Sequence, residues 1–239
     1  MPADTAAPAL RQYLAANLAV GAPDTHGPLS VFPVFGPPPA LEYIAFSQGV
    51  GAGVVIRELE TGAQVNDLLV INPTESAVLL FEGEEVLGAQ QNRTFDASVL
   101  VPANSRVEVP VSCVEAGRWD GSKGHSPFDP APQAAYPELR RLKNEAARTQ
   151  IRAGHAPRAQ QGEVWAEVAE KSARLGAMSE TAAMHDAFEA RRGRLDEFLA
   201  AIPRHDGQTG TIAAIDGRVT VLDHVSRPEV FAALHGPLV

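Results

Sequence analysis

The chain has 239 residues, of which 45% are hydrophobic, and its formal net charge is −9. This length buries a sizeable core, and we predict a single domain over residues 1–239. An acidic surface repels phosphate backbones, so the charge argues against broad nucleic-acid binding. A single cysteine, Cys113, excludes an internal disulfide framework and indicates a reducing compartment.

No membrane association is expected, because no apolar run approaches the roughly 20 residues that cross a bilayer as a helix. The first residues also lack the charged-then-apolar order of a signal peptide. We therefore expect a cytoplasmic protein. The usage of Ala, Pro, Gly and Arg is typical of a GC-rich bacterial genome.

The N-terminal part predicts a short helix at Leu10–Leu18 and then a strand at Leu29–Phe35. Pro33 inside this strand favours the edge of a sheet, because proline cannot donate to the ladder. Residues 41–48 fit either a strand or a helical turn. We interpret Gly49–Gly53 as a flexible loop, since no well-patterned helix follows these glycines to hold a phosphate.

The middle of the chain predicts a series of short strands. They are expected at Val54–Leu59, Asp67–Asn72, Val78–Phe81, Ser98–Val101 and Val107–Glu115. Apolar runs of this kind, bounded by Gly, Pro and Asn, are typical of a sandwich or a barrel. We predict an antiparallel β-sandwich or distorted barrel as the β core, over residues 29–119.

The rest of the chain predicts mainly helices, after a long loop at Asp120–Pro137. Apolar residues at helical spacing over residues 137–202 predict three helices, with Ser179 as the N-cap of the third. Residues 210–236 predict a hairpin that turns at Asp216-Gly217, followed by a last helix. The predicted fold class is therefore α+β.

The most distinctive stretch is FEGEEVLGAQQNRTFDASVLVPANSRVEVPVSCVEAGRW, at Phe81–Trp119. It resembles the signature of an uncharacterised family that is named for its association with ADP-ribosylglycohydrolases and rhodanese-phosphatase superfamily proteins. The segments LSVFPVF and GTIAAIDGRV, and the helix with Trp165, fall where that family has its other blocks. The chain departs from it at Gly49–Gly53, where the family has a short helix and loop. The resemblance implies an ADP-ribose, nucleotide or RNA-processing context, and it carries over no established catalytic residue.

Three carboxylates lie in the expected turn Glu82–Glu85. A close carboxylate pair would serve general acid/base chemistry, because mutual repulsion raises one pKa toward neutrality. The candidate catalytic residues are Glu82, Glu84 and Glu115. The other interpretation is a solvated hairpin turn, so the sequence leaves open whether this chain is an enzyme.

The polar run Gln90–Arg93 lies between two apolar segments. A buried Arg93 needs a carboxylate partner. The carboxylates considered for this role are Glu82, Glu84 and Glu115. In one interpretation Arg93 presents a bidentate fork to a phosphate or carboxylate ligand, with Asn92 or Gln91 fixing the orientation. In the other, Arg93 forms a structural ion pair that holds two strands.

The residues after the last strand of the core are candidates for the mouth of a pocket. Arg118 and Trp119 come just after Cys113 and Glu115. Since Cys113 has no activating His nearby in the sequence, we interpret it as a buried apolar thiol. Trp119 either stacks on a base or sugar or packs on the core, and we favour the core.

The long loop over residues 117–132 brings Arg118, Lys123 and His125 together on an acidic protein. This local positive charge favours an anionic small ligand, whereas the alternative is a mobile surface loop. The seven histidines form no HxH or HExxH pattern, so we expect no metal site and no cofactor.

Two functions follow from the sequence. The first is the binding or processing of an anionic, nucleotide-like small molecule by Gln91, Asn92, Arg93, Arg118 and Trp119. The alternative is a non-catalytic module for protein interaction or self-association through its helices, so a homo-oligomer is left open.

Overall fold

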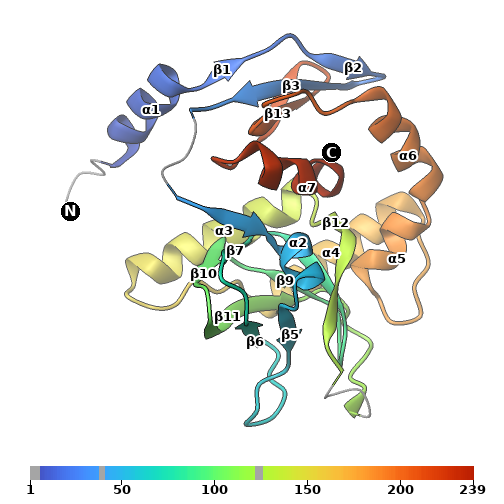
Figure 1. The fold of residues 1–239 in the computed structure, drawn as a ribbon. Helices are drawn as coiled ribbons and strands as arrows, with labels where there is room; N and C mark the ends of the chain where they lie inside the picture. Colours follow the sequence, from blue (N-terminus) through green and yellow to red (C-terminus); the bar gives the residue numbers. More distant parts are fainter. Residues whose placement is uncertain (1–5, 38–40, 122–125) are drawn as a thin grey trace. The chain divides into compact units, whose positions relative to one another are not determined.

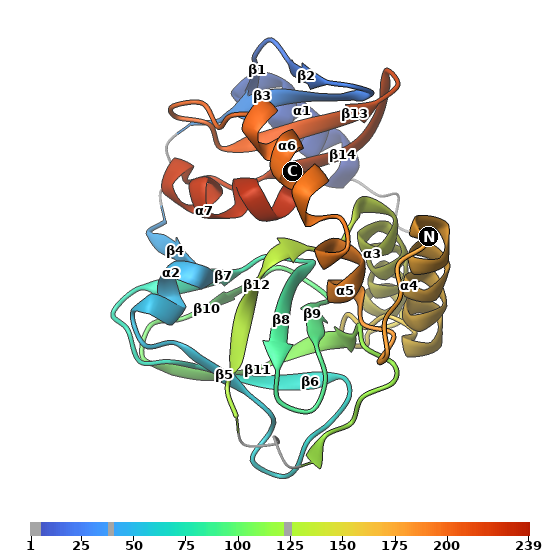
Figure 2. The same cartoon turned by 90° about the vertical axis from the view of Figure 1, so that its right-hand side faces the viewer.

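The fold is known from a computed structural model that describes residues 6–37, 41–121 and 126–239. It is a mixed α+β fold, as the sequence predicts (Figures 1 and 2). The described chain forms two compact units, and the single domain over 1–239 stays a prediction. In the described part, no helix combines the length and the apolar character that crossing a membrane requires.

One unit combines the N-terminal residues up to Leu41 with Glu197–His235. Its strands form an antiparallel sheet in the order β1-β3-β13-β14, and β2 also pairs with β3. The strands are β1 (Ala19–Val20), β2 (Asp24–His26), β3 (Leu29–Phe35), β13 (Gly210–Ile215) and β14 (Arg218–His224). The helices nearest to these strands in the sequence are α1 (Ala6–Asn17), α6 (Arg192–Ala201) and α7 (Pro228–Leu238).

Two features of this sheet bear on the predictions. The hairpin turns at Asp216 and Gly217, whose φ angles of 48° and 73° fit a tight two-residue turn. β3 has the predicted bounds, but it pairs with β13 in the register Val34 to Gly210. It therefore lies in the sheet of the hairpin, whereas we predicted it in the β core of residues 29–119.

The other unit contains a closed six-stranded barrel in the order β11-β6-β5-β12-β8-β9. The strands are β5 (Val55–Arg57), β6 (Asp67–Asn72), β8 (Glu84–Gly88), β9 (Arg93–Phe95), β11 (Ser105–Cys113) and β12 (Phe128–Ala134). A separate three-stranded sheet has the order β10-β7-β4. Its strands are β4 (Tyr43–Ala45), β7 (Ala77–Leu80) and β10 (Val99–Val101). The distorted barrel of the prediction is confirmed.

Two local predictions for this unit are wrong. Gly49 and Gly51 lie in helix α2 (Phe46–Gly51) and not in a flexible loop. The stretch Asp120–Pro137 contains β12, which pairs with β8 through a shifted register between Pro130 and Ala134. Prolines cannot donate to a ladder, so this strand has the sequence of a loop.

The helical region also differs in detail from the prediction. Figure 2 shows α3 (Pro137–Arg152), α4 (Gln161–Leu175) and α5 (Met184–Glu189) next to the barrel. The third predicted helix is split into α5 and α6. Ser179 is not the N-cap of α5, which is Ala183, although the Ala183 N–H donates to Ser179 Oγ at 2.8 Å.

Alternation along the strands gives the barrel two different faces. Inside, Val86, Phe95 and Val111 belong to an apolar core. The pairing of Val86 with Arg93, and of Arg93 with Cys113, places Arg93 and Cys113 on this inner face.

The outer face of the same three strands carries the row Glu85, Thr94 and Ser112. Helix α3 reaches this row with Lys143, which is buried and donates to Thr94 Oγ1 at 2.5 Å and to Phe95 O at 2.7 Å. The Nζ atom of Lys143 lies 3.1 Å from Asp96 Oδ1, which also accepts a hydrogen bond from Ser112. A buried ion pair therefore anchors α3 to the barrel.

Replacing Lys143 by Met should destabilise the protein by about 3–5 kcal/mol, because it leaves the buried charge of Asp96 uncompensated. Urea unfolding measures this difference. The control is Arg158→Met, since Arg158 pairs with Asp67 at 2.7 Å but has a side chain that is 39% exposed, and its loss should cost less than about 1 kcal/mol. Equal effects of the two substitutions would contradict this account.

Candidate functional site

The polar run that the sequence places between strands is a tight loop from β8 to β9. Gly88 and Ala89 have positive φ angles of 132° and 40°, so the backbone turns at once and does not continue as a strand. All four side chains of Gln90–Arg93 are buried, with Arg93 at 0% exposure. A regular strand would have directed alternate side chains to opposite faces.

The carboxylate of Glu115, which accepts four hydrogen bonds, holds this loop in place. Glu115 accepts hydrogen bonds from Arg118 Nε at 2.8 Å and Nη2 at 2.7 Å, which is a bidentate pair. It also accepts from the Asn92 N–H at 3.0 Å and from Thr181 Oγ1 at 2.7 Å. Arg118 in turn donates to Ala89 O at 2.8 Å. Burial acts to raise the pKa of Glu115, but its hydrogen bonds from Arg118, Thr181 and Asn92 outweigh burial and lower it.

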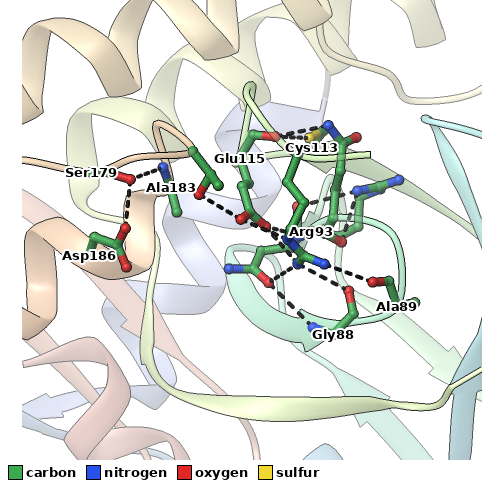
Figure 3. Close-up of polar contacts among 12 residues, drawn as sticks. Gly88, Ala89, Arg93, Cys113, Glu115, Ser179, Ala183 and Asp186 are labelled. Carbon is green, nitrogen blue, oxygen red and sulfur yellow. Dashed lines mark hydrogen bonds and ion pairs between the residues drawn. The ribbon is translucent and has the colours of Figure 1, made fainter. Parts of the chain in front are cut away.

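Glu115 and Arg118 are therefore both committed to contacts within the chain. Figure 3 shows Glu115 beside Arg93, Cys113 and the loop residues Gly88 and Ala89. We define this arrangement as the Glu115–Arg118 clamp. It positions the loop, and it leaves Glu115 ionised.

Cys113 is buried and free, as we expected. Its Sγ lies 3.3 Å from Glu115 O, and Gln161 of α4 pairs with both its backbone N–H and its carbonyl, at 2.9 and 2.8 Å. Burial raises the pKa of the Cys113 thiol, although the nearby Arg93 acts to lower it. A thiol in this state is a weak nucleophile.

Arg93 differs from Arg118 in how its donors are used. Its Nη1 donates to Gln91 O at 2.9 Å. The Nε and Nη2 atoms, which form the side-on fork of a guanidinium, find no hydrogen-bond acceptor among the described residues. Arg118 fills the same fork with Glu115. Arg93 is thus a buried cation whose bidentate edge is unused.

Among the described residues, the carboxylate within 4 Å of Arg93 is that of Glu58, directly after β5. Glu58 Oε1 lies 3.9 Å from Arg93 Nη2, which is too far for a hydrogen bond. No described group donates a well-formed hydrogen bond to either oxygen of Glu58, although the backbone of Gln90 lies near enough to act on its charge. Burial raises the pKa of Glu58, and Arg93 and the Gln90 backbone oppose this effect.

The prediction that Glu82, Glu84 or Glu115 is the partner of Arg93 is therefore wrong. Glu115 pairs with Arg118, as described above. Glu82 Oε1 accepts from Arg140 Nε at 2.8 Å, and Glu84 Oε2 accepts from the Phe81 N–H at 2.7 Å. Sequence reasoning missed Glu58, although it lies two residues after the inward-facing Ile56.

The other two predicted binding residues are also part of the loop. Gln91 donates from Nε2 to Glu115 O at 2.9 Å, and Asn92 Oδ1 lies 3.2 Å from Arg118 Nη2. The side-chain oxygens of Gln90 and Gln91 are buried and accept no hydrogen bond from described residues. Asn92 is thus committed to the clamp, whereas Gln91 keeps a free acceptor.

Trp119 does not pack into the core, which corrects our prediction. Its side chain is 50% exposed. The Arg93 guanidinium carbon lies 5.8 Å from the centroid of its ring, within the range of a cation–π contact. Trp119 is therefore the partly exposed neighbour of a fully buried Arg93.

The predicted positive cluster on the following loop is only partly described, because Lys123 and His125 lie outside the described residues. Within residues 6–37, 41–121 and 126–239, no group of three His, Cys, Asp or Glu side chains is arranged so that it could hold a metal ion.

A second polar network lies on the outer face of the barrel. Glu85 accepts from Gln133 Nε2 at 2.6 Å, and the same Nε2 lies 2.9 Å from His185 Nδ1. Burial raises the pKa of Glu85 to about 8, and it also raises the pKa of Glu84 to about 8. Neither carboxyl lies in a solvated turn, since both belong to β8.

Comparison with known proteins identifies a family. The model of the ARG and Rhodanese-Phosphatase-superfamily-associated Protein domain matches residues 17–239. No curated protein and no solved structure matches the chain.

The two buried carboxyls of β8 should make stability depend on pH. Their folded pKa values of about 8 exceed the ordinary value of 4.5, so their contribution is complete below about pH 4.5 and is lost as pH rises through about 8. Between about pH 5 and pH 9, the unfolding free energy should fall, by at most about 1.36 kcal/mol per unit of pKa shift for each carboxyl. Urea unfolding at several pH values measures this fall.

Glu84→Gln and Glu85→Gln each should reduce this fall, because the amide stays neutral at every pH. Glu108→Gln, at an exposed position of β11, is the matched control and should leave the pH profile unchanged. A wild-type profile that is flat over this range would contradict the assignment of two neutral carboxyls.

Proposed function

This chain belongs to the family of the ARG and Rhodanese-Phosphatase-superfamily-associated Protein domain, and we propose that it binds a small anionic, nucleotide-like ligand at Arg93. The observation that carries the proposal is the unused Nε and Nη2 edge of Arg93 inside the barrel. Two parallel N–H groups at this edge match the two oxygens of a phosphate or a carboxylate.

The surroundings of Arg93 support a ligand of this kind. The side chain is fully buried, and a charge-assisted hydrogen bond is stronger where water is excluded. The free oxygen of Gln91 offers an acceptor for a hydroxyl or amine of the ligand. The family name adds an ADP-ribose or nucleotide context, which agrees with a phosphate group.

Trp119 supplies the rest of the proposed site. Its ring is half exposed and lies against Arg93. A ligand reaches the fork of Arg93 when this ring moves aside, and the ring then offers an aromatic face to a base or sugar. Since Glu115 is saturated by donors, we assign it to the support of the loop and propose no reaction. We further propose a cytoplasmic location, consistent with the free Cys113.

The alternative function is an interaction or self-association module. A groove of about 410 Å³ lies along α3 and α4. Its lining is largely polar or charged and consists of Arg141, Leu142, Glu145, Ala146, Thr149 and Glu163. Stable protein interfaces have an apolar centre, so this groove adds little to the alternative.

A thermal-shift panel of sulfate, phosphate, ADP and ADP-ribose tests the proposal. A ligand at about 100 times its Kd should stabilise the wild type by about 2.7 kcal/mol. Arg93→Lys keeps the positive charge and loses the fork, so it should weaken binding by about tenfold or more. Far-UV circular dichroism establishes that the variant is folded.

Arg106→Lys is the control, because Arg106 lies on the exposed side of β11 and pairs with Glu60. It should keep the full shift. An unchanged shift in folded Arg93→Lys, or no shift with any ligand in the wild type, would remove the proposal and leave the interaction module as the function to pursue.

A further inference from the structure

The pair of Arg93 and Glu58 is unlike the other buried ion pairs of the barrel. Arg118 contacts Glu115 at 2.7 Å, and Lys143 contacts Asp96 at 3.1 Å. Arg93 and Glu58 are 0% and 4% exposed, yet their charged groups remain 3.9 Å apart. Among the described residues, the two oxygens of Glu58 and the Nε and Nη2 atoms of Arg93 make no well-formed hydrogen bond, and only the backbone of Gln90 lies near enough to act on the Glu58 charge as a donor. The two groups thus balance each other's charge while most of their hydrogen-bonding capacity stays unused.

An anion in the fork of Arg93 changes this balance. Its oxygens would lie next to Glu58 Oε1, which lies 3.9 Å from Arg93 Nη2. Two negative groups at contact distance in a buried site disfavour the ionised form of both. If Glu58 stayed ionised, it would repel the ligand that Arg93 attracts.

We propose that Glu58 is the second binding residue of this site, which takes up one proton when an anion binds Arg93 and donates it as a hydrogen bond to the anion. This inference rests on the proposed function. The proton comes from solvent and forms the O–H bond of the Glu58 carboxyl. Arg93 then has the anion as its counter-ion in place of Glu58, and no other bond forms or breaks.

The groups around Glu58 are consistent with this exchange. Arg93 of β9 and the backbone of Gln90 are the neighbours that act on its charge, and burial already favours its neutral form. Around Arg93 lie Cys113, Arg118 and Glu115 as well. Glu115 is not the proton acceptor, because four hydrogen bonds hold its carboxylate in the ionised state.

Isothermal titration with sulfate tests the inference, since the charge of sulfate is constant over neutral and mildly alkaline pH. At a pH where Glu58 is ionised in the free protein, the wild type should take up close to one proton per sulfate, measured in buffers of different ionisation enthalpy. The Kd should rise by about tenfold per pH unit above the pKa of Glu58. Glu58→Gln should bind sulfate with no proton uptake and with a flatter pH dependence.

Glu108→Gln is the matched control and should behave as the wild type. Sulfate binding that depends on Arg93 but takes up no proton, or an equal pH slope in Glu58→Gln, would overturn the role of Glu58 and leave the proposed function standing. Absence of binding of sulfate, phosphate, ADP and ADP-ribose at every pH would instead overturn both. The buffer series needs only the wild type, so it decides the matter even when Glu58→Gln does not fold.

Discussion

The candidate site depends on the bidentate contact between Glu115 and Arg118. Glu115 lies two residues after the end of β11. Through Asn92 and Thr181 it ties together the β8–β9 loop and the segment before α5. A loop with buried amides and a positive φ angle at Ala89 is costly unless its polar groups are paired. The clamp supplies that pairing, and the position of Arg93 at the start of β9 follows from it.

The two arginines of this region, Arg118 and Arg93, have different roles. Arg118 is partly exposed and has a full set of acceptors, so it acts on structure. Arg93 is buried and keeps two donors unused, an arrangement that is unfavourable by itself. Proteins tolerate such groups mainly at functional sites. Arg93 is the candidate binding residue because its Nε and Nη2 atoms are unused, whereas the same atoms of Arg118 bind Glu115.

The sequence predicts the parts of the fold that depend on local patterns. β6 and β3 have the predicted bounds, and α3 begins at Pro137, the first residue of the predicted helical region. It does not predict β12, whose prolines resemble those of a loop, or the pairing of β3 with β13, which joins segments far apart in the chain. For the same reason Arg93 was found from its polar run, whereas its neighbour Glu58, 35 residues earlier in the sequence, was not.

The way in which the barrel closes has a consequence for its interior. β12 joins β5 through the pair Phe128 and Ile56 alone among the described pairings, whereas β11 and β6 are paired from Ser105 to Pro110. Separating β5 from β12 therefore breaks fewer ladder hydrogen bonds than separating any other pair of neighbouring barrel strands. Local separation of β5 from β12 should therefore need less free energy than separation of the other strand pairs. Because β5 leads directly into Glu58, such an opening would admit water or a small solute to this carboxyl from the side of the barrel.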